Sequence, residues 1–136
     1  MTMSKLMQTI EVKSIGAKEV TVKYKGGCHC GQIAFEVEGD IKQVIACNCS
    51  FCSKRGSLMW FVPKANFRLT TPIENYSTYT FYKHKIQHRF CPKCGSAPFE
   101  QGVSPTGELT VAVNVRCLDD LDLSVVEVNQ FDGRKL

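Results

Sequence analysis

The sequence predicts a single all-β domain, and three observations support this prediction. Several short runs alternate apolar with polar residues or are rich in β-branched and aromatic residues, which is typical of strands. No window of a dozen residues carries an apolar stripe with the helical period. With 136 residues, 43% of them hydrophobic, the chain can bury one core but is too short for two ordinary domains. We therefore expect mainly antiparallel sheets connected by loops.

The N-terminal part divides into an extension and the first strands. Residues 1–19 show no convincing apolar period, so we assign them to an N-terminal extension and place the domain at residues 20–136. β-branched residues become frequent at 20–24, and we expect Gly26 and Gly27 to interrupt that strand. A half-buried strand follows, because the apolar residues at 33, 35 and 37 alternate with less apolar ones before a turn at 39–40.

The remaining strands are predicted from short apolar runs. A piece at 44–46 leads into a cysteine-rich loop, and the run 58–62 is apolar on both faces, as expected of a central strand that ends at Pro63. We assign Trp60 to the core. Further strands are expected at 67–69, 76–82, 86–90, 109–115 and 125–128. The segment 109–115 alternates most regularly.

Eight cysteines indicate either a disulfide framework or metal ligation. The first residues do not resemble a signal peptide, and no apolar run approaches the ~18 residues of a membrane span, so we expect a cytoplasmic protein with reduced thiols. Seven of the eight lie in three compact elements: Cys28-His29-Cys30, Cys47-Asn48-Cys49-Ser50-Phe51-Cys52 and Cys91-Pro92-Lys93-Cys94. This spacing favours zinc over disulfides.

Two zinc sites of different kinds follow from ligand chemistry. Cys91 and Cys94 form a zinc knuckle, which needs two more ligands, and Cys28 and Cys30 are the natural complement. Such a site is closed by four thiolates and is structural.

Cys47, Cys49 and Cys52 would then form a second site with three thiolates and an open fourth position, as catalytic zinc has. Because three thiolates weaken the Lewis acidity of zinc, we expect this site to bind an incoming soft thiol better than it activates water. The alternative is that Cys117 completes the second site and makes both zinc ions structural.

The charge gives no argument for a nucleic-acid partner. The formal net charge is +4, from 17 Lys and Arg against 13 Asp and Glu, and two zinc ions with seven thiolates would lower it to +1. Residues 83–89 hold the one basic cluster, which we interpret as a solvated strand face, with His84 and His88 at the surface. His29, between two ligands, is expected to face solvent or to make a hydrogen bond beside the metal.

The three cysteine elements, in this order and with Gly26-Gly27 before the first and Gly95-Ser96 after the last, resemble the glutathione-dependent formaldehyde-activating enzyme family, which includes centromere protein V. The resemblance covers about residues 24–134. It implies an all-β, Mss4-like fold and the same division of zinc ligands, with Cys28, Cys30, Cys91 and Cys94 structural and Cys47, Cys49 and Cys52 catalytic.

The resemblance also implies an activity. The family's named reaction is that of a carbon–sulfur lyase, which joins glutathione and formaldehyde to S-hydroxymethylglutathione, so a small thiol and a small aldehyde are the expected partners. Lys83, Lys85 or Arg89 would be available to hold substrate carboxylates. The competing hypothesis is a non-catalytic binding module whose zinc ions only maintain the fold.

Overall fold

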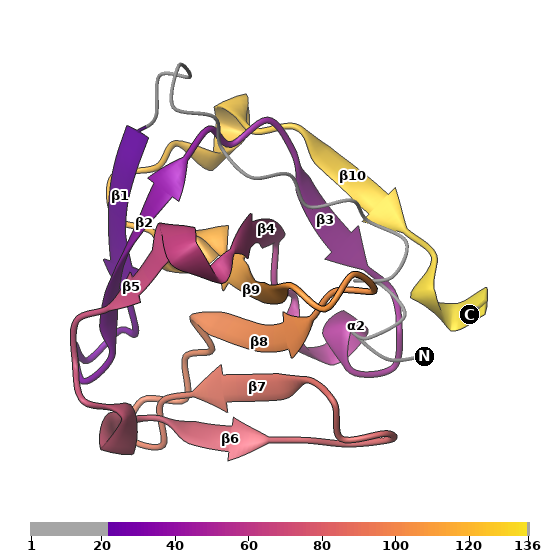
Figure 1. Cartoon of the computed structure of the whole chain (residues 1–136). Coiled ribbons are helices and arrows are strands. Elements are labelled where there is room, and N and C mark those ends of the chain that lie inside the picture. Colours follow the sequence, from indigo (N-terminus) through magenta and orange to yellow (C-terminus); the bar gives the residue numbers. More distant parts are fainter. Residues whose placement is uncertain (1–21, 136) are drawn as a thin grey trace.

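The computed structural model describes residues 22–135 as two β-sheets with little helix (Figure 1). The N-terminal extension predicted at 1–19 lies outside these residues. The smaller sheet has the strand order β1-β2-β5: β1 (Val22–Gly27), β2 (Ala34–Gly39) and β5 (Phe67–Leu69). The larger has the order β10-β3-β4-β9-β8-β7-β6: β10 (Val128–Phe131), β3 (Val44–Cys47), β4 (Met59–Pro63), β9 (Leu109–Asn114), β8 (Phe99–Val103), β7 (Gln87–Phe90) and β6 (Ser77–Tyr79).

Within residues 22–135, helical structure is limited to short segments, all but the last of them between strands. One turn of α-helix, α2 (Cys52–Arg55), follows the cysteine-rich loop and ends at Gly56 in the left-handed region. Five 3-10 segments lie at Lys64–Asn66, Ile73–Asn75, Val115–Cys117, Leu123–Val125 and Gly133–Lys135. The prediction of a single all-β domain is confirmed. In the described part of the chain, no helix has the length and apolar character needed to cross a membrane.

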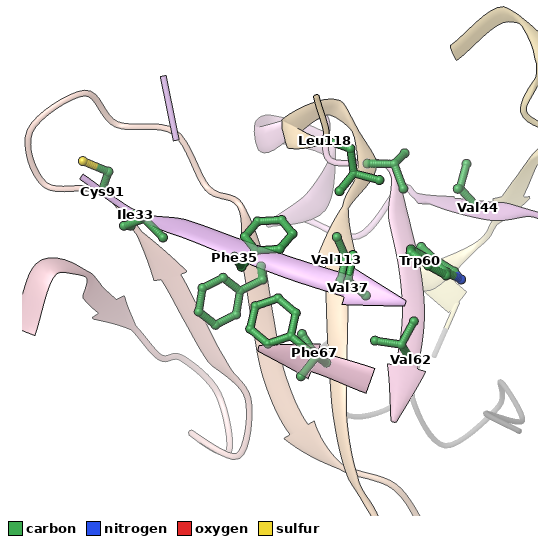
Figure 2. Close-up of a cluster of buried hydrophobic side chains, with 13 residues drawn as sticks. Ile33, Phe35, Val37, Val44, Trp60, Val62, Phe67, Cys91, Val113 and Leu118 are labelled. Atoms are coloured by element: carbon green, nitrogen blue, oxygen red, sulfur yellow. The ribbon is translucent and has the colours of Figure 1, made fainter. Parts of the chain in front are cut away.

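The main core lies between the two sheets. Phe35 of β2 and Phe67 of β5 stack with their ring centroids 5.0 Å apart, and Phe67 lies 4.8 Å from Phe99 of the larger sheet. Figure 2 shows the rings of Phe35 and Phe67 near Val113 and Val62, with Trp60 in the same cluster. The predicted assignment of Trp60 to the core is confirmed, since 7% of its surface is exposed.

The larger sheet is buried on its second face as well. Tyr79, His88, Glu100, Ala112 and Phe61 are successive cross-strand partners on β6, β7, β8, β9 and β4, so their side chains form one row on one face. The cysteine-rich loop covers this face, where Cys47, Cys49 and Cys52 cluster with Met59, Ile86 and Ala112. The cysteine-rich loop and the sheet therefore share a second, smaller core.

Strand β1 continues through the two glycines that were expected to end it. Gly26 pairs with Phe35 and Gly27 with Ala34, so both belong to the ladder. A Cβ atom on Gly26 would lie 2.5 Å from the backbone oxygen of Cys117 and 2.8 Å from the ring of Phe35. The glycine is needed because another backbone passes close to the strand, not because the strand turns.

Other strand predictions need correction. The strand predicted at 76–82 ends at Tyr79, and Tyr82 and His84 beyond it have positive φ angles of 58° and 55°. The last strand begins at Val128 instead of 125 and runs parallel to β3, within an otherwise antiparallel sheet. Strand β8 was missed entirely, because Glu100, Gln101 and Gly102 do not form an apolar run.

Candidate metal centres

The first cysteine cluster joins the hairpin after β1 to the turn after β7. The sulfurs of Cys28, Cys30, Cys91 and Cys94 all lie within 4.8 Å of one another. The Sγ atoms of Cys28 and Cys30 are 3.7 Å apart, and those of Cys30 and Cys91 are 3.6 Å apart. Four sulfurs at about 2.3 Å from zinc would be separated by about 3.8 Å in a regular tetrahedron. The donor set and its spacing therefore fit a tetrahedral zinc ion.

Hydrogen bonds support this cluster from outside. The backbone N–H of Ile33 donates to Cys28 Sγ at 3.2 Å, and that of Cys94 donates to Cys91 Sγ at 3.4 Å. The Ser96 hydroxyl and backbone lower the pKa of Cys94 to about 5. Donors aimed at sulfur favour the thiolate, which is the form that binds a metal.

The second cluster is held by the end of β3 and the start of α2. The sulfurs of Cys47, Cys49 and Cys52 also lie within 4.8 Å of one another, and all three residues are buried. The N–H of Cys49 donates to Cys47 Sγ at 3.5 Å, and the N–H of Cys52 donates to Cys49 Sγ at 3.4 Å. Within residues 22–135, no fourth histidine, cysteine, aspartate or glutamate joins this group.

Crowding of the three thiols shifts their pKa values in opposite directions. Hydrogen bonds from Cys47 and Cys52 lower the pKa of Cys49, whereas the neighbouring Cys47 and Cys49 raise the pKa of Cys52. One thiolate is thus stabilised by two thiols, and a second negative charge in the same small volume is disfavoured. A divalent cation bound here would remove that penalty, because it neutralises the charges that otherwise repel.

The C-terminal segment fixes the loop between these ligands. Asn48 donates from Nδ2 to Asp132 Oδ1 at 3.0 Å and accepts at Oδ1 from the N–H of Arg134 at 3.1 Å. Arg134 also donates from Nε to the backbone oxygen of Asn48 at 2.8 Å. Figure 1 shows β10 running beside β3 toward this loop. The last residues of the domain therefore orient the cysteine-rich loop.

A buried histidine lies on the sheet beneath the second cluster, where a surface histidine was predicted. His88 is 1% exposed, its Nδ1 lies 3.0 Å from Glu100 Oε1, and its ring lies 4.3 Å from that of Phe51 in the cysteine-rich loop. Ile86 and Phe90, two residues to either side of His88, would share its strand face and were the signal for burial, but the basic neighbours decided the prediction. Glu100 lies on β8, a strand that the sequence did not predict. His88 and Glu100 come together only through the register between β7 and β8.

Cys117 is a member of neither cluster. Burial raises its pKa to about 11, and the charged neighbours that contribute to this shift include Cys28 and Cys94 of the first cluster. It lines a cavity of about 300 Å³ together with Arg55, Ser57, Ser96 and Asn114. The structure therefore does not bring Cys117 to the three-cysteine cluster, as the alternative zinc assignment required.

The predicted carboxylate-binding residues do not gather at the second cluster. Lys83 and Lys85 are exposed on the segment between β6 and β7. Arg89 is engaged elsewhere, donating to Gln101 Oε1 at 3.0 Å and to Thr78 Oγ1 at 2.6 Å, with its guanidinium 4.6 Å from the Tyr76 ring centroid. The predicted solvated face therefore holds Lys83 and Lys85, whereas Arg89 is hydrogen-bonded on the sheet. His29 is exposed, and its backbone N–H points to Ser96 Oγ at 3.4 Å.

The fold and the two thiol clusters define an all-β protein suited to binding zinc at two places, one with four cysteine donors and one with three. All eight cysteines are free thiols, which is consistent with metal binding and not with a disulfide framework. The model of the glutathione-dependent formaldehyde-activating enzyme family matches residues 23–132. The chain belongs to this family.

A solved structure supports the same assignment. A Rhodobacter sphaeroides protein of known crystal structure shares 30% sequence identity with this chain, and the two structures superpose with a TM-score of 0.67. The match covers 77% of this chain and 99% of that one. The shared fold therefore extends over most of the described residues.

Proposed function

We propose that this protein is a zinc-dependent carbon–sulfur lyase acting on adducts of a small thiol and a small aldehyde, with S-hydroxymethylglutathione as the model adduct. The observation that carries the proposal is the three-sulfur cluster of Cys47, Cys49 and Cys52, which no fourth donor of residues 22–135 completes. The family match supports glutathione and formaldehyde as the substrate class. We also propose a cytoplasmic location, where the thiols remain reduced.

In this proposal the two clusters have different roles. Zinc held by Cys28, Cys30, Cys91 and Cys94 would stabilise the fold, since a metal bound only by the folded chain adds its binding free energy to stability. Zinc held by Cys47, Cys49 and Cys52 would supply an electrophilic position for a thiol or a carbonyl oxygen. The residues themselves hold the loop in place and exclude water, because all three cysteines are buried.

The experiment uses the protein with cobalt in place of zinc. Titration with glutathione should change the visible absorption of the cobalt bound by the three-cysteine cluster, because a fourth sulfur enters its coordination sphere. Cys49→Ser should lose this response. Exchange NMR with ¹³C-formaldehyde should then show faster interconversion of free aldehyde and glutathione adduct in the presence of the zinc protein.

The opposite result would favour a different function. A cobalt spectrum typical of two four-sulfur sites, unchanged by any thiol, would indicate that both metals only support the fold. The protein would then be a zinc-stabilised binding module, and the proposed lyase activity would be rejected.

A further inference from the structure

An ionisable pair is buried on the sheet face that the cysteine-rich loop covers. His88 and Glu100 are 1% and 6% exposed, and they are direct cross-strand partners on β7 and β8. Their neighbours in the same row are Tyr79 on one side and Ala112 on the other, and Ala112 contacts the cysteine cluster. Burying an ionisable pair is unfavourable unless its hydrogen bonds are satisfied, so its presence needs an explanation.

The pair is incompletely satisfied. His88 Nδ1 lies 3.0 Å from Glu100 Oε1, but the approach is not aligned for a hydrogen bond, and Glu100 Oε2 has no hydrogen-bond partner among residues 22–135 either. A buried carboxylate oxygen without a donor is rare in folded proteins and indicates a functional constraint or a missing ligand. A structural ion pair would be expected to use all of its strong acceptors.

The surroundings point from this pair toward the three-cysteine cluster. The ring of Phe51, between Cys49 and Cys52 in sequence, lies 4.3 Å from the ring of His88. Ala112, the cross-strand partner of Glu100, packs in the same cluster as Cys47, Cys49 and Cys52. Among residues 22–135, the one titratable side chain whose ring faces His88 is Tyr79, and the two ring centroids are 6.4 Å apart.

We propose that the His88–Glu100 pair is the proton acceptor and donor of the reaction at the three-cysteine cluster; this inference rests on the proposed function. Addition of a thiol to an aldehyde breaks an S–H bond, forms a C–S bond, opens the C=O double bond and forms an O–H bond. No electron is gained or lost overall, and one proton moves from sulfur to oxygen. The pair takes the proton when the thiol binds as thiolate and returns it to the new alkoxide.

The dry environment favours this role. An imidazole nitrogen and a carboxylate oxygen can each accept a proton, and two such groups side by side can share it. Because both side chains are buried, a proton held by the pair is shielded from solvent.

The test counts protons when glutathione binds to the zinc-loaded protein in the absence of aldehyde. Isothermal titration calorimetry at pH 7, in two buffers of different ionisation enthalpy, gives the number of protons released to solvent. A thiol that binds as thiolate releases about one proton when nothing in the protein accepts it. The wild type should release far fewer than one, whereas His88→Gln and Glu100→Gln should release about one.

The matched control is Thr110→Val, which changes another buried polar residue on the same sheet face and should behave as the wild type. Release of about one proton by the wild type would overturn the proposal, even where the variants do not fold. Equal release by the wild type and both variants would also overturn it. If the cobalt spectrum responds to thiol in either case, the proposed lyase function stands without this pair, and if glutathione does not bind at all, both proposals fail.

Discussion

At the scale of single residues, the structure separates the cysteines that could bind metal from the one that does not. Seven cysteines belong to two compact sulfur clusters, whereas Cys117 lies in a polar cavity outside both. Its sequence position, alone at the end of a regular strand, already argued against ligation. In the structure, Cys117 ends the 3-10 segment Val115–Cys117 and lines a pocket with Arg55 and Ser96.

Metal content tests this separation directly. Cys117→Ala should retain two zinc ions per chain, because its thiol is in neither cluster. Cys49→Ser should retain only one, because a hydroxyl is a poor replacement for a thiolate ligand. Elemental analysis of the purified variants measures both values. Loss of a zinc ion from Cys117→Ala would show that this residue is a ligand after all.

A second prediction concerns the close backbone contact at Gly26. Gly26→Ala should destabilise the protein by about 1–3 kcal/mol, because the new methyl group would overlap both the backbone oxygen of Cys117 and the ring of Phe35. Chemical denaturation of the zinc-loaded protein measures the change. Lys25→Ala, on the exposed side of the same strand, is the matched control and should have little effect. Equal stability of both variants would contradict the account.

At the scale of elements, the smaller sheet carries a charge pattern that stabilises strand pairing. Oε2 of Glu36 on β2 lies 3.0 Å from Nη2 of Arg68 on β5 and 3.3 Å from Nζ of Lys23 on β1. These partners lower the pKa of Glu36 below its usual 4.5, Arg68 being the larger cause. The ion pairs therefore contribute stability above about pH 4.5, and this contribution is lost as the pH falls through the lowered pKa.

Glu36→Gln tests the pairing through its pH dependence. The variant should have a lower melting temperature than the wild type near neutral pH, and the difference should disappear at a pH low enough to protonate Glu36 in the folded protein. Thermal melts followed by circular dichroism give the comparison, and Glu108→Gln is a control without a described ion pair. A difference that persists unchanged in acid would mean that packing, not charge, explains the effect.

The C-terminal segment is the element that orients the cysteine-rich loop. Asn48→Ala removes the side-chain hydrogen bonds to Asp132 and Arg134, at a cost of about 1 kcal/mol. One of the two zinc ions should then transfer to a chelator about fivefold faster, measured with a colorimetric zinc indicator. Asn66→Ala, which removes a bond to Glu38 on the other sheet, should leave both rates unchanged. Acceleration of both zinc ions would indicate general destabilisation instead.

Strands with strong apolar patterns were predictable from the sequence, and those with polar patterns were not. β2, β4 and β9 follow the predicted segments closely, because each contributes apolar residues to the core between the sheets. β8 was missed because Glu100 and Gln101 have polar side chains and Gly102 has none. Likewise, Thr110 and Ala112 on β9 look like an exposed face, yet both are buried under neighbouring structure.

The candidate metal ligands were predictable because cysteine chemistry and spacing are local properties. The surroundings of the second cluster were not, because they depend on the register between distant strands. His88 and Glu100 are separated by 12 residues in sequence and meet only through the pairing of β7 with β8. A histidine in a basic segment looks like a surface residue until this register places it under the cysteine-rich loop.

At the scale of the whole molecule, the two cysteine clusters occupy different parts of the fold. The four-cysteine cluster connects the hairpin at residues 28–30 to the turn at residues 91–94 and so joins distant parts of the chain. The three-cysteine cluster packs on the other face of the larger sheet, and no fourth donor from residues 22–135 completes it. We therefore expect the first to support folding and the second to be available for a ligand.

The central claim is that the metal bound by Cys47, Cys49 and Cys52 takes its fourth ligand from outside the protein. The most direct measurement is X-ray absorption at the zinc edge after adding the selenol analogue of glutathione. The account predicts a zinc–selenium distance from about half of the zinc, and its loss in Cys49→Ser. A spectrum that keeps only protein sulfur around both zinc ions would contradict it.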